Sequence, residues 1–286
     1  MRKMMRWAVY VAGSLIVLAV IGAAAVWVIG GQKLAAHGAG KPDHLAKPTP
    51  AQLADANRQL HVLRCADCHE EGLRGDLFFD EPNVATIYAP NLTEVAAHAT
   101  DEQLARAIRQ GIGSDGRALV IMPSATFARL DDSEVAALIS AIRALPKVGE
   151  ATPGRRIGFL GRLGLVTGKF HTTPEQVAEY AARQPIDLGP QYRRGRHIAA
   201  SNCAECHGPD LGGGEAEPGL DAPDLTIAGA YDEDAFKALI RTGVPPGGRK
   251  LKMMGEVAID DLSRMSDAEI ADLHAYLQAR AQQLSR

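Results

Sequence analysis

The sequence predicts an all-α protein in which two similar helical domains follow one N-terminal membrane helix. Three observations lead to this prediction: an uncharged apolar stretch near the start of the chain, a short cysteine motif that occurs twice, and apolar spacing typical of helices around both motifs. The 286 residues are enough for about two ordinary domains. We expect an anchor over residues 1–31, a tether over 32–50, a first domain over 51–148, a connection over 149–190 and a second domain over 191–286.

The first element is the uncharged stretch at residues 7–30, which follows a basic tail containing Arg2, Lys3 and Arg6. A helix of that length rises about 36 Å, enough to cross a hydrocarbon core of about 30 Å. A cleaved secretory signal has an apolar region of only about 7–15 residues, so the length favours an uncleaved anchor in the lipid bilayer. Because basic residues remain on the cytoplasmic side, we expect a single-pass protein of the bacterial inner membrane with its domains in the periplasm.

The composition changes after the anchor. Residues 32–50 are rich in Gly, Ala, Pro, Lys and His without helical or strand periodicity, which predicts a tether. The whole chain has 31 Lys and Arg against 34 Asp and Glu, and three of the basic residues lie in the N-terminal tail. The exported part is therefore mildly acidic, which argues against nucleic acid as a partner.

All four cysteines fall in two motifs, residues 65–69 (CADCH) and residues 203–207 (CAECH). Each is Cys-x-x-Cys-His, the attachment signature of a c-type haem. Two thiols one helical turn apart can each form a thioether with a haem vinyl group, and the adjoining histidine can coordinate iron. We therefore expect two covalently bound haem c groups, attached through Cys65, Cys68, Cys203 and Cys206, with His69 and His207 as iron ligands.

Two other interpretations of a Cys-x-x-Cys pair remain, a disulfide or redox pair and half of a zinc site. Neither requires a histidine directly after the second cysteine, and here that histidine is present twice. The absence of a c-type haem spectrum after expression with the attachment machinery would favour such a module.

The surroundings of the two motifs also repeat, as an internal duplication requires. Residues 89–93 (APNLT) follow the first motif and residues 222–226 (APDLT) follow the second. A helix is expected after each, because apolar residues four apart precede a glycine stop. The matching positions are Leu104, Ile108 and Gly111 in the first copy and Phe236, Ile240 and Gly243 in the second.

Further helices are expected before each motif and at the end of each copy. The spacing predicts helices over residues 51–63 and 191–200. Capping boxes are expected at Thr100 with Gln103, Asp131 with Glu134, and Ser266 with Glu269. Pro146 should end the last helix of the first copy. Strand signals are too weak to predict a sheet.

With these features in place, each copy resembles a class I cytochrome c domain. That family has an N-terminal helix ending in Cys-x-x-Cys-His, a Pro-x-Leu segment on the histidine side, a distal methionine, and a C-terminal helix that crosses the first. The resemblance implies that the carbonyls of Pro90 and Pro223 accept hydrogen bonds from His69 and His207.

The resemblance also implies a close helix crossing at Gly195. The first copy has Asn57 at the equivalent spacing. We therefore expect its crossing to differ from that of the second copy.

The remaining iron ligands are sought among the methionines outside the tail, which are Met122, Met253, Met254 and Met265. Methionine is by default an adaptable core residue. However, Met122 lies in a Pro-containing loop before a last helix, where the family places its ligand. In the second copy, residues 254–258 (MGEVA) are similar to a Met-Ser-Glu-Val-Ala run of related cytochromes, which favours Met254 over Met253. Met265 aligns with Leu130 and is interpreted as core.

Histidine and methionine on both irons would leave no open position for a substrate. We therefore expect one-electron transfer, and an electron-transfer protein or subunit rather than a catalyst. Residues 155–162 (RRIGFLGR) and 192–195 (YRRG) resemble the interdomain region of cytochrome c subunits of membrane-associated alcohol and aldehyde dehydrogenases. Those subunits commonly carry three haems, whereas this chain has two motifs. The same residues also fit a packed connection between domains.

The partners that the resemblance implies are redox proteins. The donor would be a periplasmic or membrane dehydrogenase or a quinol-linked protein, and the acceptor a respiratory cytochrome or oxidase. Two alternatives remain open. One is a dihaem subunit of a cbb3-type terminal oxidase, which co-purification with such an oxidase would support. The other is an enzyme, such as a dihaem peroxidase or thiosulfate dehydrogenase, which a high-spin resting spectrum would support.

Overall fold

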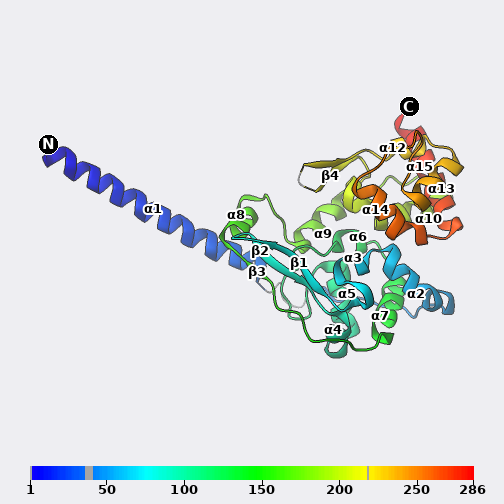
Figure 1. The fold of residues 1–286 in the computed structure, drawn as a ribbon, viewed down its shortest axis with the longest axis horizontal. Coiled ribbons are helices and arrows are strands. Elements are labelled where there is room, and N and C mark those ends of the chain that lie inside the picture. Colours follow the sequence, from blue (N-terminus) through cyan, green and yellow to red (C-terminus); the bar gives the residue numbers. More distant parts are fainter. Residues whose placement is uncertain (1, 36–40, 218) are drawn as a thin grey trace.

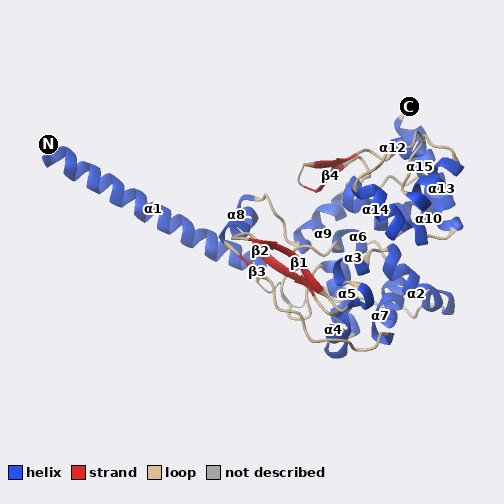
Figure 2. Ribbon diagram, in the orientation of Figure 1, coloured by secondary structure: helices blue, strands red, loops and turns tan. Residues whose placement is uncertain are grey.

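The structure is a computed structural model that describes residues 2–35, 41–217 and 219–286. A long helix projects from a body of two helical lobes (Figure 1). Most of the described chain is helical, as the sequence predicts, with short strands in each half (Figure 2). Each lobe is built around its own hydrophobic core.

The projecting helix is α1 (Arg2–Leu34), one unbroken helix of 33 residues. By length and composition it can cross a membrane, and none of its most apolar window is buried. It runs one turn beyond the predicted anchor. Its end packs against α8 (Phe159–Thr167), and Lys33 pairs with Glu175 at 2.7 Å. The end of α1 is therefore docked on the body.

Part of the expected tether, residues 36–40, lies outside the described residues. The part from Lys41 onward lies along the first lobe. The Lys41 amide donates to Gln110 at 3.1 Å, Asp43 forms an ion pair with Arg109, and Leu45 packs against the first core. This described part is held by the lobe.

The first lobe contains α2 (Pro50–Val62), α3 (Cys65–His69), η1 (Glu71–Leu73), α4 (Leu92–His98), α5 (Asp101–Gln110), α6 (Ser124–Phe127) and α7 (Asp132–Ala144). Helix α2 packs across α7. The capping boxes at Thr100 and Asp131 are both present, and α7 stops just before Pro146. These predicted boundaries are confirmed.

The second lobe contains η2 (Pro190–Tyr192), α10 (Arg193–Ile198), a π-helical turn (Ala199–Cys203), α11 (Ala204–His207), α12 (Thr226–Gly229), α13 (Glu233–Thr242), α14 (Met253–Asp260), η4 (Leu262–Arg264) and α15 (Asp267–Leu284). Helix α10 crosses α15 at Gly195, where an added Cβ would lie 2.0 Å from the carbonyl oxygen of Asp272. The predicted close crossing is confirmed. In the first lobe Asn57 is exposed and Ala56 takes the buried position on α2.

The prediction that the chain has no sheet is wrong. β1 (Asp76–Glu81) pairs antiparallel with β2 (Ala85–Ala89), which pairs with β3 (Arg156–Ile157). A second hairpin joins β4 (Gly214–Glu217) to β5 (Leu220–Ala222). Every residue of β1 is exposed. Because no face of β1 is buried, its sequence lacks the apolar alternation by which a strand is recognised.

The connection between the lobes is packed. It contains β3, α8 and α9 (Thr173–Ala182), and α9 lies against α6 while α8 lies against α1. This agrees with the interpretation of the segment as a packed connection.

Candidate functional site

The two cysteine motifs occupy equivalent short helices. The first forms α3, and the second begins at the end of the π-helical turn and continues through α11. All four cysteines are half-buried free thiols. Burial raises the pKa of Cys65 and of Cys203 to about 12, so both thiols are neutral in apolar surroundings. Such surroundings suit an uncharged thioether sulfur.

The two motif histidines have identical hydrogen-bond partners. Nδ1 of His69 lies 2.8 Å from the carbonyl oxygen of Pro90, and Nδ1 of His207 lies 2.8 Å from that of Pro223. A carbonyl oxygen only accepts, so each Nδ1 carries the proton and each Nε2 keeps a lone pair. Burial lowers the pKa of both histidines. The two predicted hydrogen bonds are confirmed, and the neutral rings are in the tautomer that an iron ligand requires.

The loops after the motifs share a backbone conformation. The amide of Gly75 donates to the carbonyl of His69 at 2.8 Å, and that of Gly213 donates to the carbonyl of His207 at 2.9 Å. Both glycines have positive φ, 72° and 92°. A Cβ at Gly75 would lie 2.4 Å from the carbonyl oxygen of Ala89, so the hairpin leaves room only for glycine. The duplication therefore extends to the hairpins that the sequence did not reveal.

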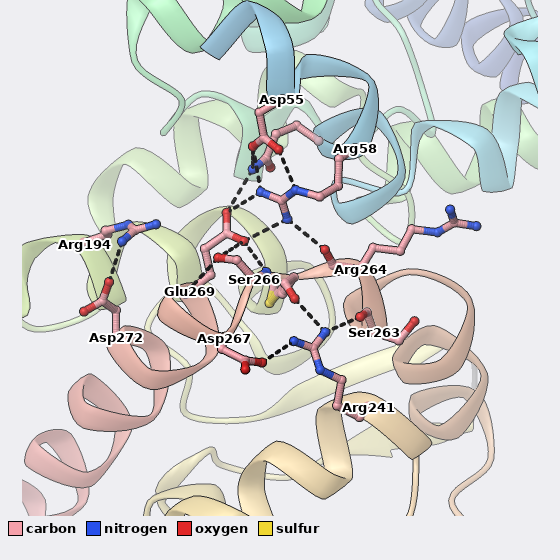
Figure 3. A network of polar contacts seen from close by, with 12 residues as sticks. Asp55, Arg58, Arg194, Arg241, Ser263, Arg264, Ser266, Asp267, Glu269 and Asp272 are labelled. Atoms are coloured by element: carbon pink, nitrogen blue, oxygen red, sulfur yellow. Dashed lines mark hydrogen bonds and ion pairs between the residues drawn. The ribbon is translucent and has the colours of Figure 1, made fainter. Parts of the chain in front are cut away.

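An arginine supports the start of the last helix in each copy. Arg109 donates to the carbonyl of Leu130 at 3.2 Å and to the aspartate two residues later at 2.7 Å. Arg241 does the same with the carbonyl of Met265 at 2.6 Å and with Asp267 at 2.7 Å (Figure 3). Met265 therefore stands where the first copy has Leu130. It is 2% exposed within the second core, which confirms its interpretation as core.

Met122 lies in the loop between α5 and α6, and its side chain packs against the first core. The connection between the lobes supports this loop. The amide of Thr173 donates to the carbonyl of Leu119 at 2.8 Å, and its hydroxyl donates to the carbonyl of Met122 at 3.2 Å. Thr173 has no exposed surface. The first residue of α9 thus helps to position the candidate ligand, and the sequence contained no signal for this role.

Met253 and Met254 open α14. Both are half-buried, and Met254 packs against the second core. This packing is the same as that of Met122 in the first copy.

The two motifs meet where the lobes join. Arg64, directly before the first motif, forms an ion pair with Glu205 inside the second. The Asp67 carboxylate of the first motif faces Asp261, which is 3% exposed. Burial and this neighbouring carboxylate raise the pKa of Asp261 to about 7. The hydroxyl of Tyr180 donates to the carbonyl of Ala204 at 3.3 Å.

Further polar contacts continue this interface, which we call the seam. Arg58 of α2 donates to both carboxylate oxygens of Glu269 on α15 at 2.8 and 3.0 Å (Figure 3). His197 of α10 lies 2.9 Å from Glu134 at the start of α7. Val62, at the end of α2, is 2% exposed and belongs to the second core. The lobes are therefore interlocked, and the two motifs are neighbours.

The donor sets do not fit a zinc module. Across residues 2–35, 41–217 and 219–286, no group of three or more His, Cys, Asp or Glu side chains is arranged to hold a metal ion. A structural zinc site needs four such ligands. Each motif instead offers two thiols and one oriented imidazole.

Comparisons with known proteins agree with this geometry. The cytochrome c family model matches residues 192–281. The fructose dehydrogenase cytochrome subunit of Gluconobacter japonicus is 27% identical over an alignment of 275 positions that covers 82% of this chain and 55% of the relative. The chain thus spans about half the length of that relative. The second lobe of this chain is a cytochrome c domain, a type of domain that carries covalently bound haem c.

Proposed function

We propose that the chain is a membrane-anchored dihaem cytochrome c that relays single electrons between a dehydrogenase and a respiratory acceptor at the periplasmic face of the inner membrane. Two tandem class I domains would each hold one haem c, the first through Cys65 and Cys68 and the second through Cys203 and Cys206. When bound, the haem iron supplies reversible one-electron chemistry.

The observation that supports this proposal best is the pair of equivalent histidines. Each is buried, neutral, and oriented by a proline carbonyl at 2.8 Å, so each presents Nε2 as a ligand. Two such sites in neighbouring motifs suit a relay, because electrons pass readily between closely spaced centres. A protein that transforms a substrate would need a pocket beside one iron instead.

We assign the second iron ligand of each haem to Met122 and Met254. Together with histidine, a methionine ligand would raise the reduction potential and would leave no coordination position open, which favours electron transfer over reaction with a substrate. The packing of both side chains against the two cores supports this choice.

A dehydrogenase is the favoured donor because the similar protein from Gluconobacter japonicus is the cytochrome subunit of a fructose dehydrogenase. Co-purification with a dehydrogenase subunit, and reduction of the haems on addition of that enzyme's substrate, would support the relay. Co-purification with a copper-haem oxidase would point to the oxidase alternative.

The haem content of the purified full-length protein tests the proposal directly. Two haems per chain are expected, with one remaining in the variant Cys65→Ala/Cys68→Ala and one in Cys203→Ala/Cys206→Ala. One haem in the unmodified protein, lost only with the second pair of cysteines, would contradict the dihaem assignment.

The methionine ligands are tested by leucine variants, which preserve volume. Met122→Leu and Met254→Leu should each produce one high-spin haem in the resting spectrum, whereas Met253→Leu should leave both haems low-spin. A high-spin haem in the unmodified protein would favour an enzyme instead.

A further inference from the structure

A cavity of about 230 Å³ lies where α1 joins the body. Its walls are the last turn of α1, at Gly31 and Leu34, and three arginines from the first lobe and the connection: Arg117, Arg155 and Arg162. None of the described residues that line it carries a carboxylate. The cavity is therefore basic on one side and bounded by the anchor helix on the other.

Within the part of the chain that the structure describes, two of these arginines donate hydrogen bonds to carbonyls and not to a carboxylate. Arg155 donates to the carbonyls of Ala118 and Leu34, and Arg162 donates to the carbonyls of Ile157 and Trp27. Carbonyls satisfy donors but do not neutralise a charge. Burial, and next the nearby charge of Arg117, lower the pKa of Arg155, whereas the charge of Asp115 acts to raise it.

The third arginine has one acidic partner. Arg117 pairs with Asp115 at 2.5 Å, and both side chains are about half exposed. Asp115 also interacts with the charge of Arg155, so within the described residues one carboxylate accompanies three guanidinium groups and an excess of positive charge remains. Guanidinium groups bind phosphate through paired hydrogen bonds, so an anion of this type would complete the cluster.

The position of the cavity along α1 indicates where such an anion comes from. The guanidinium of Arg162 lies 4.1 Å from the ring centre of Trp27, and Gly30 allows Arg162 to pack directly against the helix. Gly31 is about 6 Å further along the helix axis than Trp27. Tryptophan favours the membrane interface, so the arginines lie at the depth of the lipid headgroups.

Helix α8 adds apolar contacts at the same depth. Phe159 and Leu160, in its first turn, are 39% and 48% exposed although the helix packs against α1. Aromatic and aliphatic side chains beside a basic cluster are typical of a surface that rests on a membrane.

We propose that this cavity binds the phosphate headgroup of an anionic phospholipid in the outer leaflet of the membrane. The proposal rests on the proposed anchoring of α1. The lipid would fix the angle between the anchor and the haem domains by occupying the joint between them.

The test uses the detergent-purified, haem-loaded full-length protein, titrated with phosphatidylglycerol, phosphatidylcholine or inorganic phosphate. Binding is followed by native mass spectrometry and by the shift in unfolding temperature. Phosphatidylglycerol should bind and stabilise, and the other two should not at the same concentration. Arg155→Gln and Arg117→Gln should each weaken binding about fivefold, and Asp115→Asn should strengthen it, because each arginine contributes through its charge.

Arg194→Gln is the matched control, since this exposed arginine pairs with Asp272 on the second lobe, away from the cavity. It should bind phosphatidylglycerol as the unmodified protein does. If Arg155→Gln fails to fold, Arg117→Gln still decides, because its side chain is half exposed. Equal binding of phosphatidylcholine, equal protection by inorganic phosphate, or unchanged affinity in Arg117→Gln would overturn the proposal.

Other observations would refute the proposed function without testing the lipid site. A protein recovered in the soluble fraction of cells would refute the anchor, and a single haem per chain would refute the relay. A membrane-bound dihaem protein that does not distinguish phosphatidylglycerol from phosphatidylcholine would refute the lipid site alone.

Discussion

Single hydrogen bonds orient the candidate ligands of both proposed haem sites. The carbonyls of Pro90 and Pro223 accept from Nδ1 of the motif histidines and so fix the tautomer in which Nε2 is free to bind iron. Both hydrogen bonds were predicted from the sequence motifs. The support of Met122 was not, because Thr173 reaches its carbonyl from a separate helix in the connection. The histidine contacts could be predicted because both partners belong to motifs that repeat in each copy. The contact of Thr173 could not, because Thr173 belongs to no repeated motif.

We expect Thr173→Val to weaken methionine ligation of the first haem. Valine keeps the shape of the buried side chain but removes the hydroxyl that donates to the Met122 carbonyl at 3.2 Å. Losing this hydrogen bond should cost about 1 kcal/mol. The measurement is the absorbance band of methionine-ligated ferric haem, followed with temperature. Thr173→Ser retains the hydroxyl and serves as the control. An unchanged band in Thr173→Val would show that the hydroxyl does not position the loop.

The pair His197 and Glu134 should make stability depend on pH. The hydrogen bond that His197 donates to the Glu134 carboxylate raises the pKa of His197. The stability contributed by the charged imidazole is therefore complete below the unfolded pKa of about 6.5 and is lost as pH rises through the folded pKa. Burial acts to raise the pKa of Glu134, but His197 lowers it overall. The stability contributed by the charged Glu134 is therefore present above about pH 4.5, the unfolded pKa, and is lost as pH falls through the folded pKa.

The expected result is a difference in unfolding temperature between the unmodified protein and His197→Gln that is largest near pH 5.5–6 and shrinks toward about pH 9. Asp131 also faces His197 and acts in the same direction. Scanning calorimetry at several pH values measures the difference. A constant difference over this range would mean that the charge of His197 does not contribute.

At the level of helices and strands, local signals predicted α1 and three helices of each copy, but not α8 and α9 of the connection. The observed α2 (Pro50–Val62) lies within one residue of its predicted range, and the capping boxes at Thr100, Asp131 and Ser266 are all formed. These signals depend on residues within one turn of each other. The hairpins were missed because backbone pairing, rather than a buried face, holds them. The π-helical turn before the second motif also lacked a sequence signal.

The crossing of α10 and α15 should tolerate no side chain at Gly195. A Cβ there would lie 2.0 Å from the Asp272 carbonyl oxygen, so Gly195→Ala must push the helices apart. Such overpacking costs typically about 1–3 kcal/mol. Denaturant unfolding of the holoprotein should show this loss, with lower haem content at the second site. Gly154→Ala is the control, because its Cβ would meet nothing within 4 Å. Equal stability of the two variants would be incompatible with the close crossing.

For the whole molecule, the arrangement of the lobes could not be predicted. In the sequence, each charged residue of the seam is indistinguishable from a residue on a solvent-exposed helix face. The ion pairs of Arg64 with Glu205 and of Arg58 with Glu269 could not be predicted, because the partners of each pair belong to different copies. The duplication of the motif was evident from the sequence, whereas the juxtaposition of the two copies is a property of the tertiary structure.

The seam should make the two lobes unfold together, and two capping residues allow this to be tested without disturbing the helices. Glu134 and Glu269 each cap their own helix through the third position of a capping box and also reach across the seam. Glutamine preserves the cap but removes the charge. The charge of Glu269 is stabilised by its partners. Burial acts to raise the pKa of its carboxyl group, but the hydrogen bonds from Arg58 contribute to lowering that pKa to about 2.

We expect Glu134→Gln/Glu269→Gln to weaken the seam by about 1–3 kcal/mol through the loss of charge-assisted hydrogen bonds. Calorimetry should then resolve two unfolding transitions where the unmodified holoprotein has one. Glu175→Gln makes the same change in the capping box of α9, where the partner is Lys33 of α1, and should keep a single transition. Two transitions in the unmodified protein would mean that the lobes are independent. A single transition in the double variant would mean that apolar contacts such as that of Val62, rather than the charges, join them.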